Sequence, residues 1–102
     1  MRVPVSINIL GEKITVSYID HDDEAHGYYD NDRNLIQIVK GDPAMMHRTL
    51  IHELGHCLFR KTGWAETLGP RREEAMCQLL EHLAAVVAFK QGSCQWTDLA
   101  EN

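Results

Sequence analysis

The stretch Thr49-Leu50-Ile51-His52-Glu53-Leu54-Gly55-His56 decides the fold of this chain, because it places the pattern H-E-x-x-H inside an apolar, helix-forming segment. Residues four apart on a helix lie one turn apart and about 40° from each other around the axis. The rings of His52 and His56 can therefore meet at one metal ion. Glu53 lies about 100° around the helix from His52, where it can hold a water on that ion without being a ligand. The pattern predicts an active-site helix that carries a hydrolytic zinc site.

The helix that carries the motif is expected to run from Pro43 to about Lys61. Asp42 is a good N-cap residue, Pro43 suits the first helical position, and Gly63 is a natural stop. One side of this helix is apolar and is expected to pack on a sheet, while the two histidines lie roughly opposite. The apolar side consists of Leu50, Leu54, Cys57 and Leu58.

Upstream of this helix, alternating apolar residues predict two β-hairpins. Residues 3–19 form the first hairpin, with Gly11 at its turn. The second hairpin joins Tyr28-Tyr29 to Leu35–Val39 through the polar turn residues 30–34. The sequence therefore predicts a small sheet before the active-site helix.

Downstream of the motif helix, a connecting loop is expected from Thr62 to Gly69, and a second long helix from near Pro70 to near Gly92. The apolar face of this second helix is expected to cover the histidine side of the first; it includes Met76, Leu79, Leu80 and Leu83. The predicted fold is thus α+β. A small antiparallel sheet of N-terminal hairpins packs on the active-site helix, and a long C-terminal helix completes a minimal zincin-like domain. Residues 1–102 form this single domain, and the tail 93–102 is expected to fray.

Composition excludes several classes of function. Hydrophobic residues make up 44% of the chain and charged residues 25%, as in ordinary globular proteins. The net charge of −5 argues against a nucleic-acid or anionic-membrane partner. The longest apolar run, residues 83–89, is too short to span a bilayer. The three cysteines form no C-x-x-C pair and no signal peptide is recognised, so a cytoplasmic location is expected.

The acidic segment that contains His21, Asp22, Asp23, Glu24 and His26 offers side chains that could form a second ion site. Runs of exposed acidic residues are usually solvated loops. We therefore expect a loop here, with no metal.

A catalytic zinc usually has three protein ligands and one water, so His52 and His56 need a partner. Metzincins continue the motif with a third histidine, but their pattern is absent after His56, where Cys57-Leu58-Phe59 follow. The second helix offers three candidates instead, which are Glu73, Glu74 and His82.

Helical geometry ranks these candidates. With Met76 at the centre of the packing face, Glu73 lies about 60° away, Glu74 about 160°, and His82 about 120° on the other side. Glu73 is therefore the predicted third ligand and Glu74 the alternative. Either glutamate could instead simply favour the helix N-terminus through the helix dipole.

The order of these elements resembles the ImmA/IrrE-type metallopeptidase domain, in the compact version found in bacteriophages and prophages. The resemblance covers roughly residues 12–90 and rests on T-L-I-H-E-L-G-H followed by E-E-A-M-C-Q-L-L-E-H-L-A-A-V-V. It implies one zinc ion held by two histidines and a glutamate, which it places at Glu73. The chain departs from the family pattern at Met76-Cys77, where Ala-Asn or Ala-Asp is usual. The substrates implied are repressor-like regulators of mobile elements, in the host cytoplasm.

The predicted function is a gluzincin-like zinc endopeptidase in which Glu53 is the catalytic base. Leu35–Val39 is a candidate edge strand for substrate alignment, and Tyr28 or Tyr29 a candidate donor to the oxyanion. The alternative is a non-catalytic zinc-binding module for protein interaction or regulation. A small-molecule hydrolase with the same ion is a third reading, without a pocket signature to support it.

Overall fold

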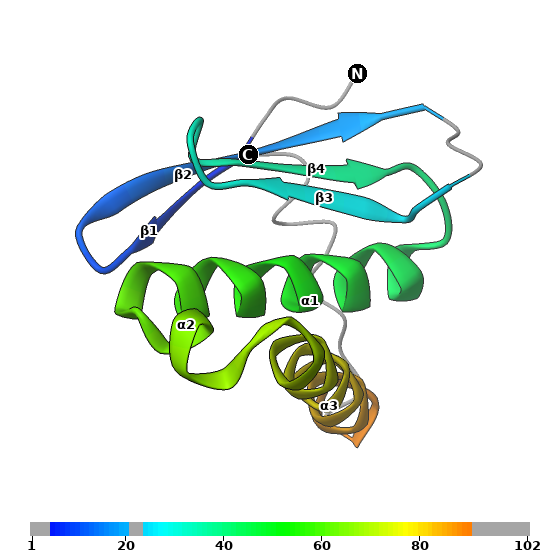
Figure 1. The fold of residues 1–102 in the computed structure, drawn as a ribbon. Coiled ribbons are helices and arrows are strands. Elements are labelled where there is room, and N and C mark those ends of the chain that lie inside the picture. Colours follow the sequence, from blue (N-terminus) through cyan, green and yellow to red (C-terminus); the bar gives the residue numbers. More distant parts are fainter. Residues whose placement is uncertain (1–4, 21–23, 91–102) are drawn as a thin grey trace.

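The computed structural model describes residues 5–20 and 24–90, which fold in three layers (Figure 1). Helix α1 (Pro43–Thr62) lies between the sheet and helix α3 (Pro70–Lys90). This arrangement confirms the α+β class and the packing of the motif helix on the sheet. The expected fraying of the tail 93–102 concerns residues outside those described.

The sheet contains four strands in the order β1-β2-β4-β3. Both predicted hairpins are present, since β1 pairs with β2 and β3 with β4, each antiparallel. The strands are β1 (Val5–Ile9), β2 (Glu12–Ile19), β3 (Gly27–Asp30) and β4 (Leu35–Val39).

The two hairpins join through β2 and β4, which run parallel. The sheet is therefore mixed: the two predicted antiparallel hairpins are joined by one parallel pairing that was not predicted. The second hairpin inserts its more apolar strand: β4 buries Ile36 and Ile38, whereas the shorter β3 takes the edge. Buried apolar strands belong in the interior of a sheet. With β4 placed next to β2 and its buried side chains facing the same core, the two strands run parallel.

The hydrophobic core lies between the sheet and α1. Leu54 packs against it, as the apolar pattern of α1 predicted. Leu58 was assigned to the same side but is 40% exposed, so that assignment is wrong. The buried members of the core are Ile14, Val16, Ile36, Ile38, Met46, Leu50 and Cys57.

Local signals set the ends of α1. The Asp42 side chain accepts a hydrogen bond from the Met45 N–H (3.2 Å), and Gly63 ends the helix in the left-handed conformation with φ of 83°. The predicted loop from Thr62 to Gly69 is wrong in one respect, because it contains the short helix α2 (Trp64–Leu68). A helix of five residues is too short to show an apolar period.

Helix α3 meets α1 where two small residues face each other. A Cβ atom added to Gly55 would lie 2.9 Å from the Cys77 sulfur, so these helices approach closely only because position 55 is glycine. The expected packing face centred on Met76 is wrong, since Met76 is 40% exposed and Leu83 is 62% exposed. The small-residue contact, rather than the apolar stripe, orients α3.

Two further expectations concern cysteines and membranes. Cys57 and Cys77 are free and buried, while Cys94 lies outside the described residues. None of the helices in the described part of the chain is long and apolar enough to cross a bilayer.

Candidate metal centre

The two motif histidines project from α1 toward α3 and point the same ring nitrogen at one atom. Nε2 of His52 lies 3.1 Å from Oε1 of Glu74, and Nε2 of His56 lies 3.0 Å from the same oxygen. The imidazole side chains are only 15% and 19% exposed, while that of Glu74 is 46% exposed. The group is thus sheltered on the α1 side and open at Glu74.

The composition and spacing of this group would allow it to hold a metal ion. One ligand atom from each of His52, His56 and Glu74 lies within 4.8 Å of the others. A tetrahedral zinc bound at about 2.0–2.1 Å needs donors about 3.3 Å apart, close to the separations from Glu74. Two imidazoles and a carboxylate are also a donor set that suits zinc. The residues present therefore fit the ion that the motif implies.

The two candidate glutamates take different places. Glu74, the alternative of the sequence analysis, faces both Nε2 atoms, whereas Glu73 contacts Nδ1 of His56 through Oε2. Glu73 is 5% exposed, and Nε of Arg60 lies 4.0 Å from its Oε2. The third candidate, His82, is exposed and does not belong to the donor group found among the described residues.

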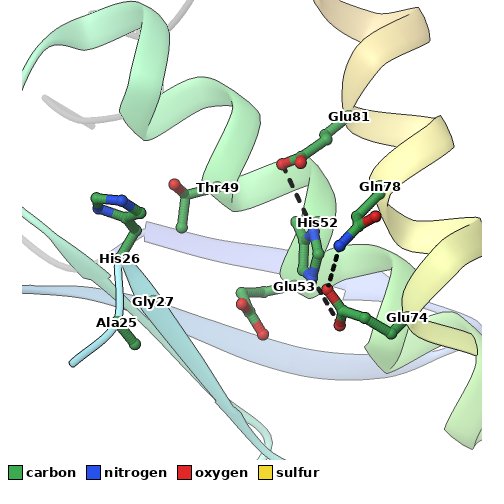
Figure 2. Close-up of a pocket in the computed structure, with 9 residues that line it drawn as sticks. All are labelled: Ala25, His26, Gly27, Thr49, His52, Glu53, Glu74, Gln78 and Glu81. Atoms are coloured by element: carbon green, nitrogen blue, oxygen red, sulfur yellow. Dashed lines mark hydrogen bonds and ion pairs between the residues drawn. The ribbon is translucent and has the colours of Figure 1, made fainter. Parts of the chain in front are cut away.

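Glu53 lies beside the donor group in a hollow of about 370 Å³ between the helices and the start of β3 (Figure 2). Burial raises the pKa of the Glu53 carboxyl, and the neighbouring charges of Glu74 and Glu81 raise it further, while His52 and His56 oppose them. A carboxylate with a raised pKa is a better proton acceptor than an ordinary exposed one.

The close approach of β3 to α1 beside Glu53 depends on a glycine in β3. A Cβ atom on Gly27 would lie 2.5 Å from Cγ2 of Thr49 and 3.5 Å from Cγ of Glu53, so a side chain at position 27 would push β3 away from α1. Gly27 and Glu53 also line a second hollow of about 260 Å³, together with Tyr28, Tyr29, His56 and Arg60. Open space therefore borders Glu53 on two sides along β3.

The tyrosines considered as oxyanion donors occupy unlike positions. The Tyr29 hydroxyl donates to Oδ1 of Asn31 (2.6 Å), and burial raises its pKa. The Tyr29 ring packs against the core, while Tyr28 is 37% exposed. Both tyrosines line the second hollow, and their role stays a prediction.

Sequence reasoning missed two polar residues on α3. The Gln78 side-chain amide donates to Oε2 of Glu74 (3.2 Å), and Oε2 of Glu81 lies 3.5 Å from Nδ1 of His52 (Figure 2). These residues follow Glu74 by four and seven positions, and therefore lie on the same face of α3. This spacing from Glu74 would have identified Gln78 and Glu81 from the sequence, if Glu74 had been chosen as the third ligand.

The surroundings shift the pKa values of Glu74 and Cys77 in opposite directions. Burial raises the pKa of Glu74, but contacts with His52, His56 and Gln78 outweigh it and leave that pKa below the ordinary value. Burial, supported by the nearby glutamates, raises the pKa of the Cys77 thiol to about 12. Cys77 is therefore a packing residue rather than a thiolate ligand or nucleophile.

Comparison with protein-family models, curated proteins and solved structures found no significant match. The interpretation of the centre therefore depends on the geometry and chemistry of its own residues.

Proposed function

We propose that this chain is a zinc-dependent metallopeptidase with His52, His56 and Glu74 as zinc ligands and Glu53 as the general base. The convergence of both Nε2 atoms on Oε1 of Glu74 carries the proposal. Two imidazoles and a carboxylate, with a further glutamate beside them, are the parts of a gluzincin-type site. The ligand differs from the sequence prediction only in the choice of Glu74 over Glu73.

Each residue has a defined task in hydrolysis. Bound zinc would supply a Lewis acid that lowers the pKa of water and polarises a carbonyl. Glu53 takes the proton of the attacking water and returns it to the leaving amine nitrogen. Gln78 donates to Oε2 of Glu74, which leaves Oε1 directed at the histidines.

The substrate that suits this arrangement is an extended peptide. Leu35–Val39 was the candidate edge strand, but β4 lies between β2 and β3 and has no free edge among the described strands. The edge next to Glu53 belongs to β3, and both hollows share Gly27 of that strand. A peptide that added a strand to β3 would pass Glu53 with backbone hydrogen bonds to hold it.

The resemblance to ImmA/IrrE-type domains supports a physiological role as well. By that resemblance the target is a repressor-like regulator of a phage or other mobile element, met in the host cytoplasm. The two described cysteines are free, in keeping with that reducing compartment.

The decisive experiment compares metal content with cleavage. The purified, zinc-loaded chain is expected to hold about one zinc and to cut an unfolded, fluorescently labelled test protein. Glu53→Gln should keep the zinc and lose at least about 100-fold in rate, because it cannot accept the proton. Elemental analysis and the fluorescence assay measure the two quantities on the same samples.

Two variants serve as controls. His56→Ala should lose the zinc, while Glu66→Gln, at an exposed position on α2, should match the parent in metal and rate. A folded parent without zinc would overturn the proposal. A zinc-loaded parent that cuts no unfolded protein would favour the non-catalytic zinc-binding module instead.

A further inference from the structure

The ring nitrogens that turn away from the donor group are not left to solvent. Each imidazole has a second nitrogen, Nδ1, and each Nδ1 meets a carboxylate from α3. Glu73 contacts Nδ1 of His56, and Oε2 of Glu81 lies 3.5 Å from Nδ1 of His52. One helix thus brings Glu74 to both Nε2 atoms and a different glutamate to each Nδ1.

We propose that Glu73 and Glu81 are positioning residues that keep the proton of each imidazole on Nδ1, so that both Nε2 lone pairs face the metal. Glu73 acts on His56 and Glu81 acts on His52. This inference rests on the proposed zinc site and adds two residues to it.

The chemistry of imidazole supports the assignment. A neutral imidazole has one N–H and one lone pair, and an acceptor beside one nitrogen selects the tautomer with the proton there. Carboxylates beside a metal-bound histidine also fix the orientation of its ring. Oε2 of Glu73, directly on Nδ1, therefore prepares Nε2 of His56 as a ligand atom.

Burial makes Glu73 the stronger of the two. At 5% exposure its carboxylate has lost most of its water, so it depends on His56 and on Arg60, whose Nε is 4.0 Å away. Glu81 is 29% exposed and lies farther from its nitrogen. Its effect on His52 should be correspondingly smaller.

The same contact explains why Glu73 is not itself a ligand. Its oxygen is engaged at Nδ1, on the side of the His56 ring away from the donor group. An ion held by Nε2 would be reached from Glu74 instead, which is already 3.0 Å from that nitrogen.

Histidine tautomers can be measured directly by long-range ¹H–¹⁵N correlation in the metal-free protein at mildly alkaline pH. The parent should show the His56 proton on Nδ1. For His52, Oε1 of Glu74 at 3.1 Å from Nε2 competes with Oε2 of Glu81 at 3.5 Å from Nδ1, so its tautomer is measured in Glu74→Met, where the proton should lie on Nδ1. Glu73→Met, which fills similar space without an acceptor, should shift His56 toward the other tautomer. In the Glu74→Met background, Glu81→Met should shift His52 toward the other tautomer and leave His56 unchanged.

Zinc affinity, measured by competition with a coloured chelator, separates positioning from ligation. Glu73→Met should weaken zinc binding by about 10- to 100-fold, the usual effect of removing such a partner. Glu73→Gln keeps an acceptor oxygen for Nδ1 and should recover most of that affinity. Glu74→Gln replaces the ligand itself, so its zinc binding should be lost, while the exposed Glu66→Gln should be unchanged.

Three results would overturn the inference. These are a parent His56 protonated on Nε2, equal losses of zinc affinity in Glu73→Gln and Glu73→Met, and full zinc binding by Glu74→Gln. If Glu73→Met does not fold, the tautomers of the parent and of Glu73→Gln still decide the question. The spectra need neither metal nor cleavage. The tautomer result can therefore be interpreted even if the chain proves to have no peptidase activity.

Discussion

Helices α1 and α3 are nearly equal in length, with 20 and 21 residues, yet they are held in place by different forces. Helix α1 buries an apolar stripe against the sheet. Among the side chains of α3 that the structure describes, the buried ones are Glu73 and Cys77, while Leu79 and Leu83 are more than 60% exposed. Helix α3 therefore docks through a small-residue contact and polar groups rather than through its apolar stripe.

This difference separates stability from function within the chain. The sheet and α1 supply the hydrophobic core, and α1 also carries the two histidines and Glu53. Helix α3 supplies the carboxylates around the histidines, including Glu74. Substitutions between the sheet and α1 should therefore change folding, whereas substitutions at the α1–α3 contact should change metal binding.

The largest effect on folding is expected from a substitution in the core between the sheet and α1. Ile38 is 0% exposed in β4, so Ile38→Ala should lower the free energy of unfolding by about 3 kcal/mol through lost burial and a cavity. Urea unfolding followed by circular dichroism measures the loss. A decrease below about 1 kcal/mol would contradict the view that this layer holds the fold together.

The sequence predicted the parts of the fold that local signals encode. Asp42, Pro43 and Gly63 marked the ends of α1, and alternation with turn residues marked both hairpins. The strand order was not predicted, because the β2–β4 pairing joins residues far apart in the chain.

The candidate site was predicted in part, for a related reason. The spacing of His52, Glu53 and His56 is local, so their common position on α1 follows from the sequence. The choice between Glu73 and Glu74 depends on the rotation of α3, and Cys77 lies about 100° around that helix from Met76. With Cys77 at the contact, Glu73 and Glu74 lie on opposite sides of it, at about 40° and 60°.

The contact between the helices can be tested with a single methyl group. Gly55→Ala would place a Cβ atom 2.9 Å from the Cys77 sulfur and 3.3 Å from Cδ1 of Leu80, so α3 must move away from α1. Zinc affinity should fall by about tenfold, because a shift of α3 carries Glu74 away from the Nε2 atoms of both histidines. The change in unfolding free energy should be smaller, since alanine improves the helix by about 1 kcal/mol while overpacking costs about 1–3 kcal/mol.

Gly41 provides the matched control for this substitution. A Cβ atom there would meet nothing within 4 Å, so Gly41→Ala should leave zinc affinity at the parent value. Chelator competition on both variants measures the difference. Equal affinities for Gly55→Ala and the parent would show that the approach of the helices does not set the ligand geometry.

The smallest effect is expected on the exposed apolar stripe of α3, and it tests the comparison from the other side. Leu79 is 65% exposed, so Leu79→Gln removes little buried area and keeps a good helix-forming residue. Unfolding free energy should change by less than about 0.5 kcal/mol, and zinc affinity should not change. Because a leucine buried as deeply as Leu50 would cost several times more, a loss above about 1.5 kcal/mol would mean that α3 is held by its apolar stripe after all.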